Sequence, residues 1–163
     1  MNYVLSYLTL AVLYIFSTTS ARYIEIFGIA PDLIFVFAVC YSMYNFPVSS
    51  AVLCAVSGLV VDLYSGSYIG PNALLYMYIG IGISNFASSL IRKNMLTTIL
   101  GVLAVSLVYH TLMLVIDYVI PLHTSFWYPL VRIVLPTAIY DAVFTVVISL
   151  WAKKLSVNTV RGL

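Results

Sequence analysis

Long apolar runs separated by short polar breaks dominate this chain. A membrane-spanning helix needs roughly 20 apolar residues, with a range of about 17–25. The pattern predicts an all-α integral membrane protein: one compact bundle of about six transmembrane helices, since no polar linker divides the chain. The predicted spans are residues 2–19, 30–44, 48–64, 71–91, 94–120 and 128–152, followed by a short tail at 153–163.

The second run is the weakest of these spans. Residues 30–44 are too few to cross a bilayer unless the helix starts before Pro31, is broken, or inserts only partly. Proline is tolerated in the first turn of a helix. We therefore expect this helix to begin close to Pro31.

Composition supports a membrane protein. The chain is 63% hydrophobic and only 7% charged, whereas a soluble domain carries about 25% charged residues. A net charge of +2 is too small and too scattered for nucleic-acid binding. The first run lacks a basic leading segment, so we interpret it as a retained helix rather than a cleaved signal.

Basic residues predict the orientation, because cytoplasmic loops are enriched in them. Arg92 and Lys93 follow the fourth run, and further basic residues follow the sixth. Six crossings put both places on one side with the N-terminus, so we expect both termini in the cytoplasm. The other side would then carry four acids and two arginines: Arg22, Glu25, Asp32, Asp62, Asp117 and Arg132.

Charges at a membrane boundary tend to pair and to face the bundle interior. We expect Arg132 to pair with Asp117, with Asp62 and Asp32 as alternatives. The same cluster could instead form a docking surface for a ligand or a partner.

Small residues form stripes on two runs, at a spacing of about four residues. Small side chains let helix backbones approach closely in lipid. A seam between helices of this bundle is the simpler interpretation, and a seam for a helix of another protein is the alternative. The stripes are Ser50, Cys54, Gly58 and Asp62 on the third run, and Gly80, Ser84 and Ser88 on the fourth.

Asp62 ends a membrane-length run and precedes a turn that contains Gly66, Gly70 and Pro71. An acid at this place is costly and needs a reason, and the glycines and the proline end one helix and start the next. We predict that Asp62 accepts hydrogen bonds from backbone N–H groups of the Ser65–Gly70 turn. It is the best candidate for a functional acid.

Asp141 lies near the middle of the sixth run, where a charge costs about 2.5–3.5 kcal/mol on insertion scales. It must be protonated, hydrogen-bonded to a neighbouring helix, or in contact with water. Tyr140 and Tyr109 are the candidate partners.

The fifth run places Ser106, His110 and Asp117 on nearly one face. A proton relay needs such titratable groups near the midplane, but this set lacks a second nearby acid. We expect His110 to form a hydrogen bond to another helix.

Signals of an enzyme are missing from the sequence. It has no nucleophile elbow, no metal-ligand spacing and no phosphate loop. Cys40 and Cys54 fall inside apolar runs and are interpreted as packing residues. We expect no catalysis, no cofactor and no metal.

Three motifs together carry a resemblance to a known family. The first is Pro31-Asp32-Leu33-Ile34. The second runs from Gly58 through Asp62-Leu63-Tyr64-Ser65-Gly66 to Gly70-Pro71-Asn72-Ala73-Leu74. The third is Arg132, Pro136 and Tyr140-Asp141 in the sixth run. In order and spacing they resemble the rod shape-determining MreD family over essentially the whole chain, although Asp141 stands where an asparagine is more usual.

This resemblance implies a scaffold role in the bacterial cytoplasmic membrane. The family is expected to bind MreC directly, in an assembly that joins the MreB cytoskeleton to RodA and a class B penicillin-binding protein for peptidoglycan synthesis. It also implies a fold similar to the substrate-binding subunits of energy-coupling-factor transporters, so a vitamin-binding subunit is the alternative function. The structural or partner-interface candidates are Asp62, Gly66, Gly70, Asn72, Asp32, Asp117, Arg132, Asp141, Ser50, Cys54, Gly58, Gly80, Ser84 and Ser88.

Overall fold

The computed structural model describes residues 2–24, 31–65, 69–89, 95–119 and 130–160, without the side chains at 2–3, 20–24, 88–89, 117–119 and 156–160. These residues are all helical apart from short caps and turns. The helices are α1 (Asn2–Ile24), α2 (Leu33–Tyr44), α3 (Pro47–Ser65), α4 (Pro71–Ser89), α5 (Met95–Val119), the π-helical segment η1 (Leu130–Val134) and α7 (Leu135–Val160).

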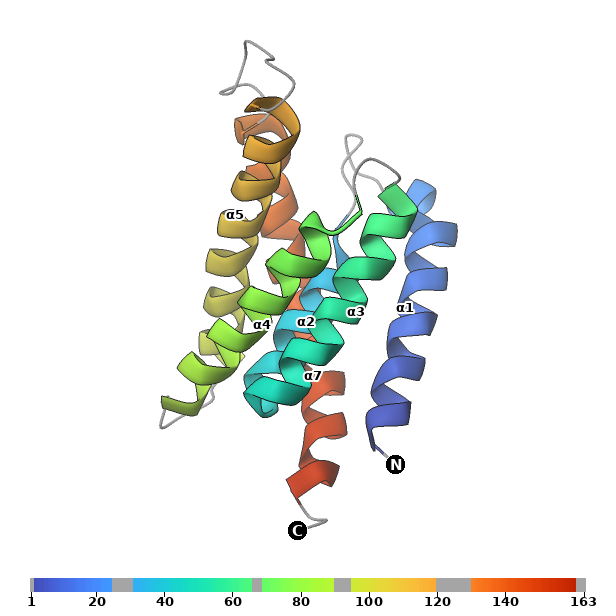
Figure 1. The fold of residues 1–163 in the computed structure, drawn as a ribbon, viewed down its shortest axis with the longest axis vertical. Helices are drawn as coiled ribbons and strands as arrows, with labels where there is room; N and C mark the ends of the chain where they lie inside the picture. Colours follow the sequence, from blue (N-terminus) through green and yellow to red (C-terminus); the bar gives the residue numbers. More distant parts are fainter. Residues whose placement is uncertain (1, 25–30, 66–68, 90–94, 120–129, 161–163) are drawn as a thin grey trace.

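The helices form one bundle in which α1 begins and α7 ends at the same end (Figure 1). We call the opposite end the distal end: α1, α3 and α5 run towards it, and α2, α4 and α7 run away from it (Figure 1). Helices α3, α4 and α5 begin and end within two residues of the predicted third, fourth and fifth spans. Helix α7 continues to Val160, and the cytoplasmic placement of the tail at 153–163 stays a prediction.

Three helices of the described chain are long and apolar enough to cross a membrane: Pro47–Ser65, Met95–Ile116 and Leu130–Leu155. Val4–Thr19 and Leu33–Tyr44 are shorter apolar helices. The chain is thus a membrane protein by length and composition of its helices, and six crossings stay a prediction.

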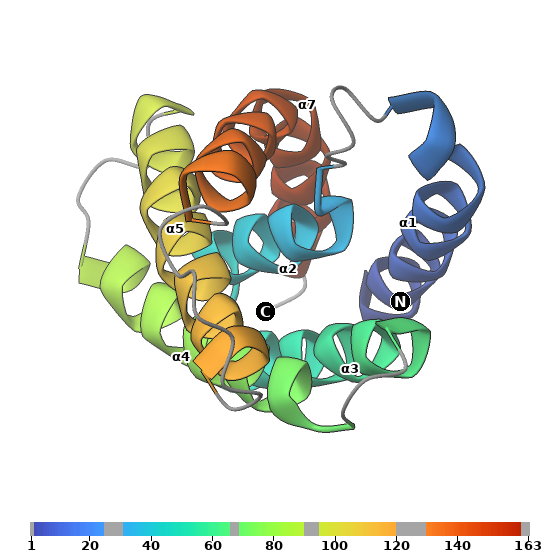
Figure 2. The same cartoon turned by 90° about the horizontal axis from the view of Figure 1, so that it is seen from above.

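The short helix α2 is the centre of the bundle. It packs against α1, α3, α4, α5 and α7, and Figure 2 shows it enclosed by the other helices. All of its residues except Tyr44 are buried. Its 12 residues span only about 18 Å, against a hydrocarbon thickness of about 30 Å. A helix that is apolar on every side is a core helix, which explains why the second run looked too short for a span.

The start of α2 follows the sequence prediction. Asp32 is its N-cap, and the carboxylate Oδ1 accepts a hydrogen bond from the backbone N–H of Phe35 at 3.0 Å. This capping satisfies one of the N–H groups that the first turn of a helix leaves without a partner.

The two small-residue stripes meet each other between α3 and α4. A Cβ atom on Gly58 would overlap the Asn72 carbonyl and would lie 2.6 Å from the Ala73 Cα atom. A Cβ atom on Gly80 would lie 2.6 Å from Cys54 Sγ and 3.1 Å from the Ser50 carbonyl oxygen. The stripes therefore form a seam within this bundle, which is the simpler of the two interpretations.

Hydrogen bonds link this seam to α2 and its C-terminal cap. Cys54 Sγ lies 3.2 Å from Ser42 Oγ on α2, and the Ser84 hydroxyl on α4 donates to the Asn45 carbonyl at 2.5 Å. Within the described residues, the buried Ser50 hydroxyl has no hydrogen-bond partner.

The π-helical segment before α7 has a cause in the sequence. Pro136 lacks an N–H group, and its ring would clash with the carbonyl of Arg132 in a regular α-helix. One widened turn over Leu130–Val134 avoids the clash. The Ile133 carbonyl then accepts a hydrogen bond from the Thr137 hydroxyl at 2.7 Å.

The seam predicts opposite effects for two glycine substitutions. Gly58→Ala should destabilise the protein by about 1–3 kcal/mol, because the added methyl group overpacks against the backbone of α4. Gly82→Ala is the matched control: nothing lies within 4 Å of its Cβ position, so it should stabilise the helix by about 0.5–1 kcal/mol. Thermal unfolding of each variant, monitored by fluorescence-detected size-exclusion chromatography, measures both changes in stability. Equal effects of the two substitutions would contradict close packing of α3 against α4 at Gly58.

Candidate functional site

Asp62 is a fully buried carboxylate that accepts four hydrogen bonds from the start of α4. Oδ2 accepts from the backbone N–H groups of Gly70 (2.9 Å) and Ala73 (3.1 Å). Oδ1 accepts from the backbone N–H of Asn72 at 3.2 Å and from its side-chain amide at 2.9 Å. All of these donors belong to one short segment, so Asp62 holds the distal end of α3 to the first turn of α4.

The geometry of this segment explains why an acid is needed there. The first N–H groups of a helix have no partner within the helix, and the positive end of its dipole favours an anion. Gly70 has a φ of +119°, a conformation that L side chains rarely adopt. This conformation belongs to the turn in which the Gly70 N–H reaches Asp62 and its carbonyl accepts the first α4 bond, from Leu74 at 2.9 Å. The predicted acceptor role of Asp62 towards Gly70 is thus present, together with the helix start beyond the turn.

Asn72 extends the Asp62 contact to α5. Because its amide nitrogen donates to Asp62, its oxygen Oδ1 is the acceptor, and it receives the Tyr109 hydroxyl at 2.6 Å. Asn72 and Tyr109 are both buried. One asparagine side chain therefore joins α3, α4 and α5.

Asp32 forms the second centre of the network. Besides capping α2 through Oδ1, its Oδ2 accepts the Tyr76 hydroxyl of α4 at 2.9 Å. Its backbone N–H donates to Asp141 Oδ1 of α7 at 3.0 Å. Asp32 thus ties the start of the central helix to two of its neighbours.

Asp141 is fully buried and is satisfied by hydrogen bonds, one of the three situations that the sequence left open. Its partners are the Asp32 N–H and, through Oδ2, the Ser106 hydroxyl of α5 at 2.5 Å. The candidate partners Tyr140 and Tyr109 were wrong. Tyr109 turns instead to Asn72, and sequence spacing cannot show which helices are neighbours.

His110 bonds within its own helix, so the expected bond to another helix was wrong. Its Nδ1 lies 2.9 Å from the Ser106 carbonyl and 3.1 Å from Ser106 Oγ. A carbonyl oxygen can only accept a hydrogen bond, so Nδ1 carries a proton. The Ser106 hydroxyl donates its hydrogen bond to Asp141. The link between helices therefore runs through Ser106 and not through the imidazole.

Aromatic rings pack around these polar groups. Phe35 stacks on Tyr109 with ring centroids 4.6 Å apart, and Tyr76 meets both rings edge to face at 5.3 and 5.2 Å. Apolar packing of this kind lowers the local dielectric, which strengthens satisfied hydrogen bonds and makes unsatisfied groups costly.

Some predicted site residues lie outside what the structure describes. These are Gly66 and the side chains of Asp117 and Ser88, so the pairing of Arg132 with Asp117 stays a prediction. Arg132 is an exposed residue of η1. Asp62 and Asp32, its alternative partners, accept the hydrogen bonds given above from other groups.

Sequence reasoning missed Tyr76 as a member of the network and assigned Tyr109 to the wrong partner. Tyr76 lies four residues after Asn72, on the same face of α4, and this spacing was a usable signal. No comparable signal places Tyr109 beside Asn72, because that contact depends on how α4 and α5 pack.

Comparison with known proteins decides the family. The chain matches the family model described as rod shape-determining protein MreD over residues 1–158. This chain belongs to the MreD family. The resemblance of its three motifs is confirmed, and with it a role in determining rod shape.

Neither the curated proteins nor the solved structures contain a match to this MreD-family chain. The expected similarity to energy-coupling-factor subunits is therefore not supported. The family and the three long apolar helices together make the chain a membrane protein.

Asp62→Ala should lower the free energy of unfolding by about 3 kcal/mol or more, because it leaves several buried N–H donors without an acceptor. Each such donor costs about 1–3 kcal/mol. Asp62→Asn should lose less, since its amide oxygen still accepts some of these bonds. The yield of folded protein in membranes and thermal unfolding in detergent measure stability, which should fall from the wild type to Asp62→Asn and then to Asp62→Ala. A stable Asp62→Ala protein would contradict the capping role.

Asp141→Asn should remain within about 1.5 kcal/mol of the wild type, the scale of one ordinary hydrogen bond. The amide oxygen can accept the Asp32 N–H, and the amide nitrogen can donate to Ser106 Oγ. Asp141→Leu, of similar size, should unfold at clearly lower temperature because it orphans both donors. Equal stability of the Asn and Leu variants would show that the hydrogen bonds are unimportant.

Proposed function

We propose that this MreD-family chain is a non-enzymatic scaffold of the cell-elongation machinery in the bacterial cytoplasmic membrane. It crosses the membrane six times, with both termini in the cytoplasm. It binds MreC through helix–helix contacts and helps couple the MreB cytoskeleton to peptidoglycan synthesis by RodA and a class B penicillin-binding protein.

The observation that carries this proposal is the use of three acids. Asp32, which is half-buried, and the buried Asp62 and Asp141 each accept hydrogen bonds that join helices. Groups occupied in this way set the relative positions of α2, α3, α4, α5 and α7. A rigid bundle with most of its mass in helices suits a protein that acts by presenting a surface to partners.

The arrangement of His110, Ser106 and Asp141 also supports a structural role. In a catalytic triad the histidine accepts the serine proton and the acid orients the histidine. Here the serine donates to the acid, and the histidine donates to the serine. The histidine therefore does not accept the serine proton as in a triad, and the Ser106 hydroxyl instead forms a link between α5 and α7.

The position of the seams reduces the number of helix faces to which a partner helix could bind. The small residues of α3 and α4 face each other, so we expect MreC to use outward apolar faces instead. Several helices, α5 among them, offer such faces with exposed side chains at a helical spacing, and we select three faces for substitution. These are Leu8, Val12 and Ile15 on α1, Val52, Val56 and Leu59 on α3, and Val143, Val147 and Leu150 on α7.

Co-purification of MreC with the tagged chain in mild detergent tests the proposal. Val12→Trp, Val56→Trp and Val147→Trp each add bulk to one exposed face. We expect the wild-type chain to recover MreC, and one of the three variants to recover about tenfold less MreC although the variant chain is as abundant as the wild type. A tenfold loss of affinity corresponds to about 1.4 kcal/mol of binding free energy, which a steric clash at the interface can supply. The other two variants serve as matched controls.

Normal abundance of the chain without any recovered MreC would contradict the proposal. Recovery of paired ATPase subunits with a bound small molecule would favour the alternative, a vitamin-binding transporter subunit.

A further inference from the structure

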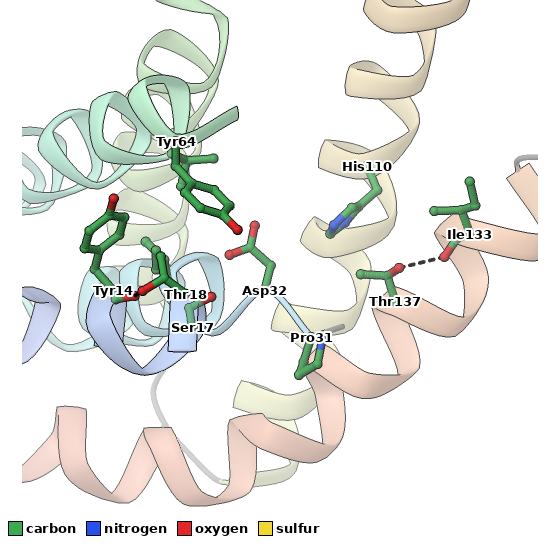
Figure 3. Close-up of a pocket in the computed structure, with 11 residues that line it drawn as sticks. Tyr14, Ser17, Thr18, Pro31, Asp32, Tyr64, His110, Ile133 and Thr137 are labelled. Carbon is green, nitrogen blue, oxygen red and sulfur yellow. Dashed lines mark hydrogen bonds between the residues drawn. The ribbon is translucent and has the colours of Figure 1, made fainter. Parts of the chain in front are cut away.

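A cavity of about 420 Å³ opens beside Asp32 in the distal half of the bundle. Residues of α1, the start of α2, the end of α3, α5 and the η1–α7 segment line it, so helices far apart in sequence build it together. This volume falls within the range of about 300–1,000 Å³ that small-molecule sites occupy. The lining is Tyr14, Ser17, Thr18, Pro31, Asp32, Ile34, Val61, Tyr64, His110, Ile133 and Thr137 (Figure 3).

Asp32 is the acid of this lining. Each of its carboxylate oxygens accepts one hydrogen bond, from the Phe35 N–H and from the Tyr76 hydroxyl. A carboxylate offers about four acceptor positions, so both oxygens can accept more. Figure 3 shows the carboxylate pointing towards Tyr64 across the cavity.

The charge of Asp32 is not neutralised by the described lining, which contains neither lysine nor arginine. Its hydrogen bonds within the described chain come from uncharged groups. A charge at membrane depth is expensive unless it meets a partner of opposite sign. The cavity therefore favours a cation.

Other lining groups are also arranged to accept. The Thr18 hydroxyl donates its proton to the Tyr14 or Ile15 carbonyl. The Thr137 hydroxyl donates to Ile133. Each of these oxygens is left with acceptor positions only.

His110 adds a ring nitrogen to the lining. Nδ1 donates to the Ser106 carbonyl, so Nε2 is the ring nitrogen that remains for a ligand. Figure 3 shows the imidazole on the same side of α5 as Asp32 and Thr137. The lining thus offers the Thr18 and Thr137 hydroxyl oxygens as acceptors near the Asp32 carboxylate.

Aromatic and apolar groups complete the wall. Tyr14 of α1 and Tyr64 of α3 meet edge to face with ring centroids 6.3 Å apart. Aromatic faces attract cations that come within about 6 Å. Ile34 and Val61 line the same cavity and suit the carbon chain that carries a charged group.

We propose that this cavity binds a primary ammonium group, with Asp32 as its counter-ion and the hydroxyl acceptors of Thr18 and Thr137 around it. An ammonium is a cation that has three donors and no acceptor, which complements an acid flanked by acceptors. Two sources have this chemistry: the headgroup of an ethanolamine phospholipid entering from the membrane, and a free amine entering from the aqueous side. The site is independent of MreC binding.

Native mass spectrometry of the purified chain tests the proposal with three lipid probes of identical acyl chains: phosphatidylethanolamine, its N-acetyl derivative and phosphatidylglycerol. If the ammonium comes from lipid, only phosphatidylethanolamine should stay bound. If it comes from a free amine, 1,5-diaminopentane should bind while the three lipids do not differ. Either result supports the ammonium site, and equal retention of all probes, or of none, overturns it.

Variants locate the binding. Asp32→Asn keeps a capping acceptor for α2 but removes the charge, and should weaken amine binding about tenfold or more, the scale of one charge-assisted hydrogen bond. Ser17→Leu fills the cavity from α1 without touching the carboxylate network, and should also abolish binding. Thr19→Leu, an exposed residue outside the lining, is its matched control. Undiminished binding by both Asp32→Asn and Ser17→Leu would overturn the proposal.

Discussion

The bond between the Asp62 carboxylate and the start of α4 is the interaction on which the distal half of this bundle depends. A carboxylate without a partner would be costly among apolar helices, and the free N–H groups at the start of a helix would be costly without an acceptor. Placing one against the other removes both costs at once. The same contact fixes how far α3 and α4 can slide, and Gly58 allows the two backbones to approach to the distance that the contact requires.

Asp32 and Asp141 apply the same solution to the remaining helices. Each carboxylate accepts hydrogen bonds from backbone or hydroxyl donors: the Asp32 N–H ties α2 to α7, Tyr76 ties α4 to α2, and Ser106 ties α5 to α7. Such hydrogen bonds have a defined direction and so orient the helices, whereas contacts made by long basic side chains are flexible. Helix α1 contributes no hydrogen bond to this network within the described chain, and packs mainly against α2 and α7, with one ring contact from Tyr14 to Tyr64 of α3.

The sequence predicted those parts of the structure that depend on local chemistry. The start of α2 close to Pro31, the small-residue stripes and the acceptor role of Asp62 follow from residue type and spacing over a short stretch of chain. The prediction failed where the answer depends on which helices become neighbours. Asp141 took Ser106 rather than a tyrosine, and Tyr109 took Asn72, because helix packing in lipid is decided by shape over many residues. The second run looked like a poor span since its hydrophobicity serves burial among other helices.

Cooperation within the network is the central claim, and a double-mutant cycle between Asp62→Asn and Tyr109→Phe tests it most directly. The two side chains do not bond each other in the structure, but both bond Asn72. If Asn72 transmits the interaction, the effects on unfolding free energy should be non-additive by about 0.5–3 kcal/mol. Additivity to within about 0.3 kcal/mol would show that the two contacts act separately, and would contradict a network that holds the helices as one unit.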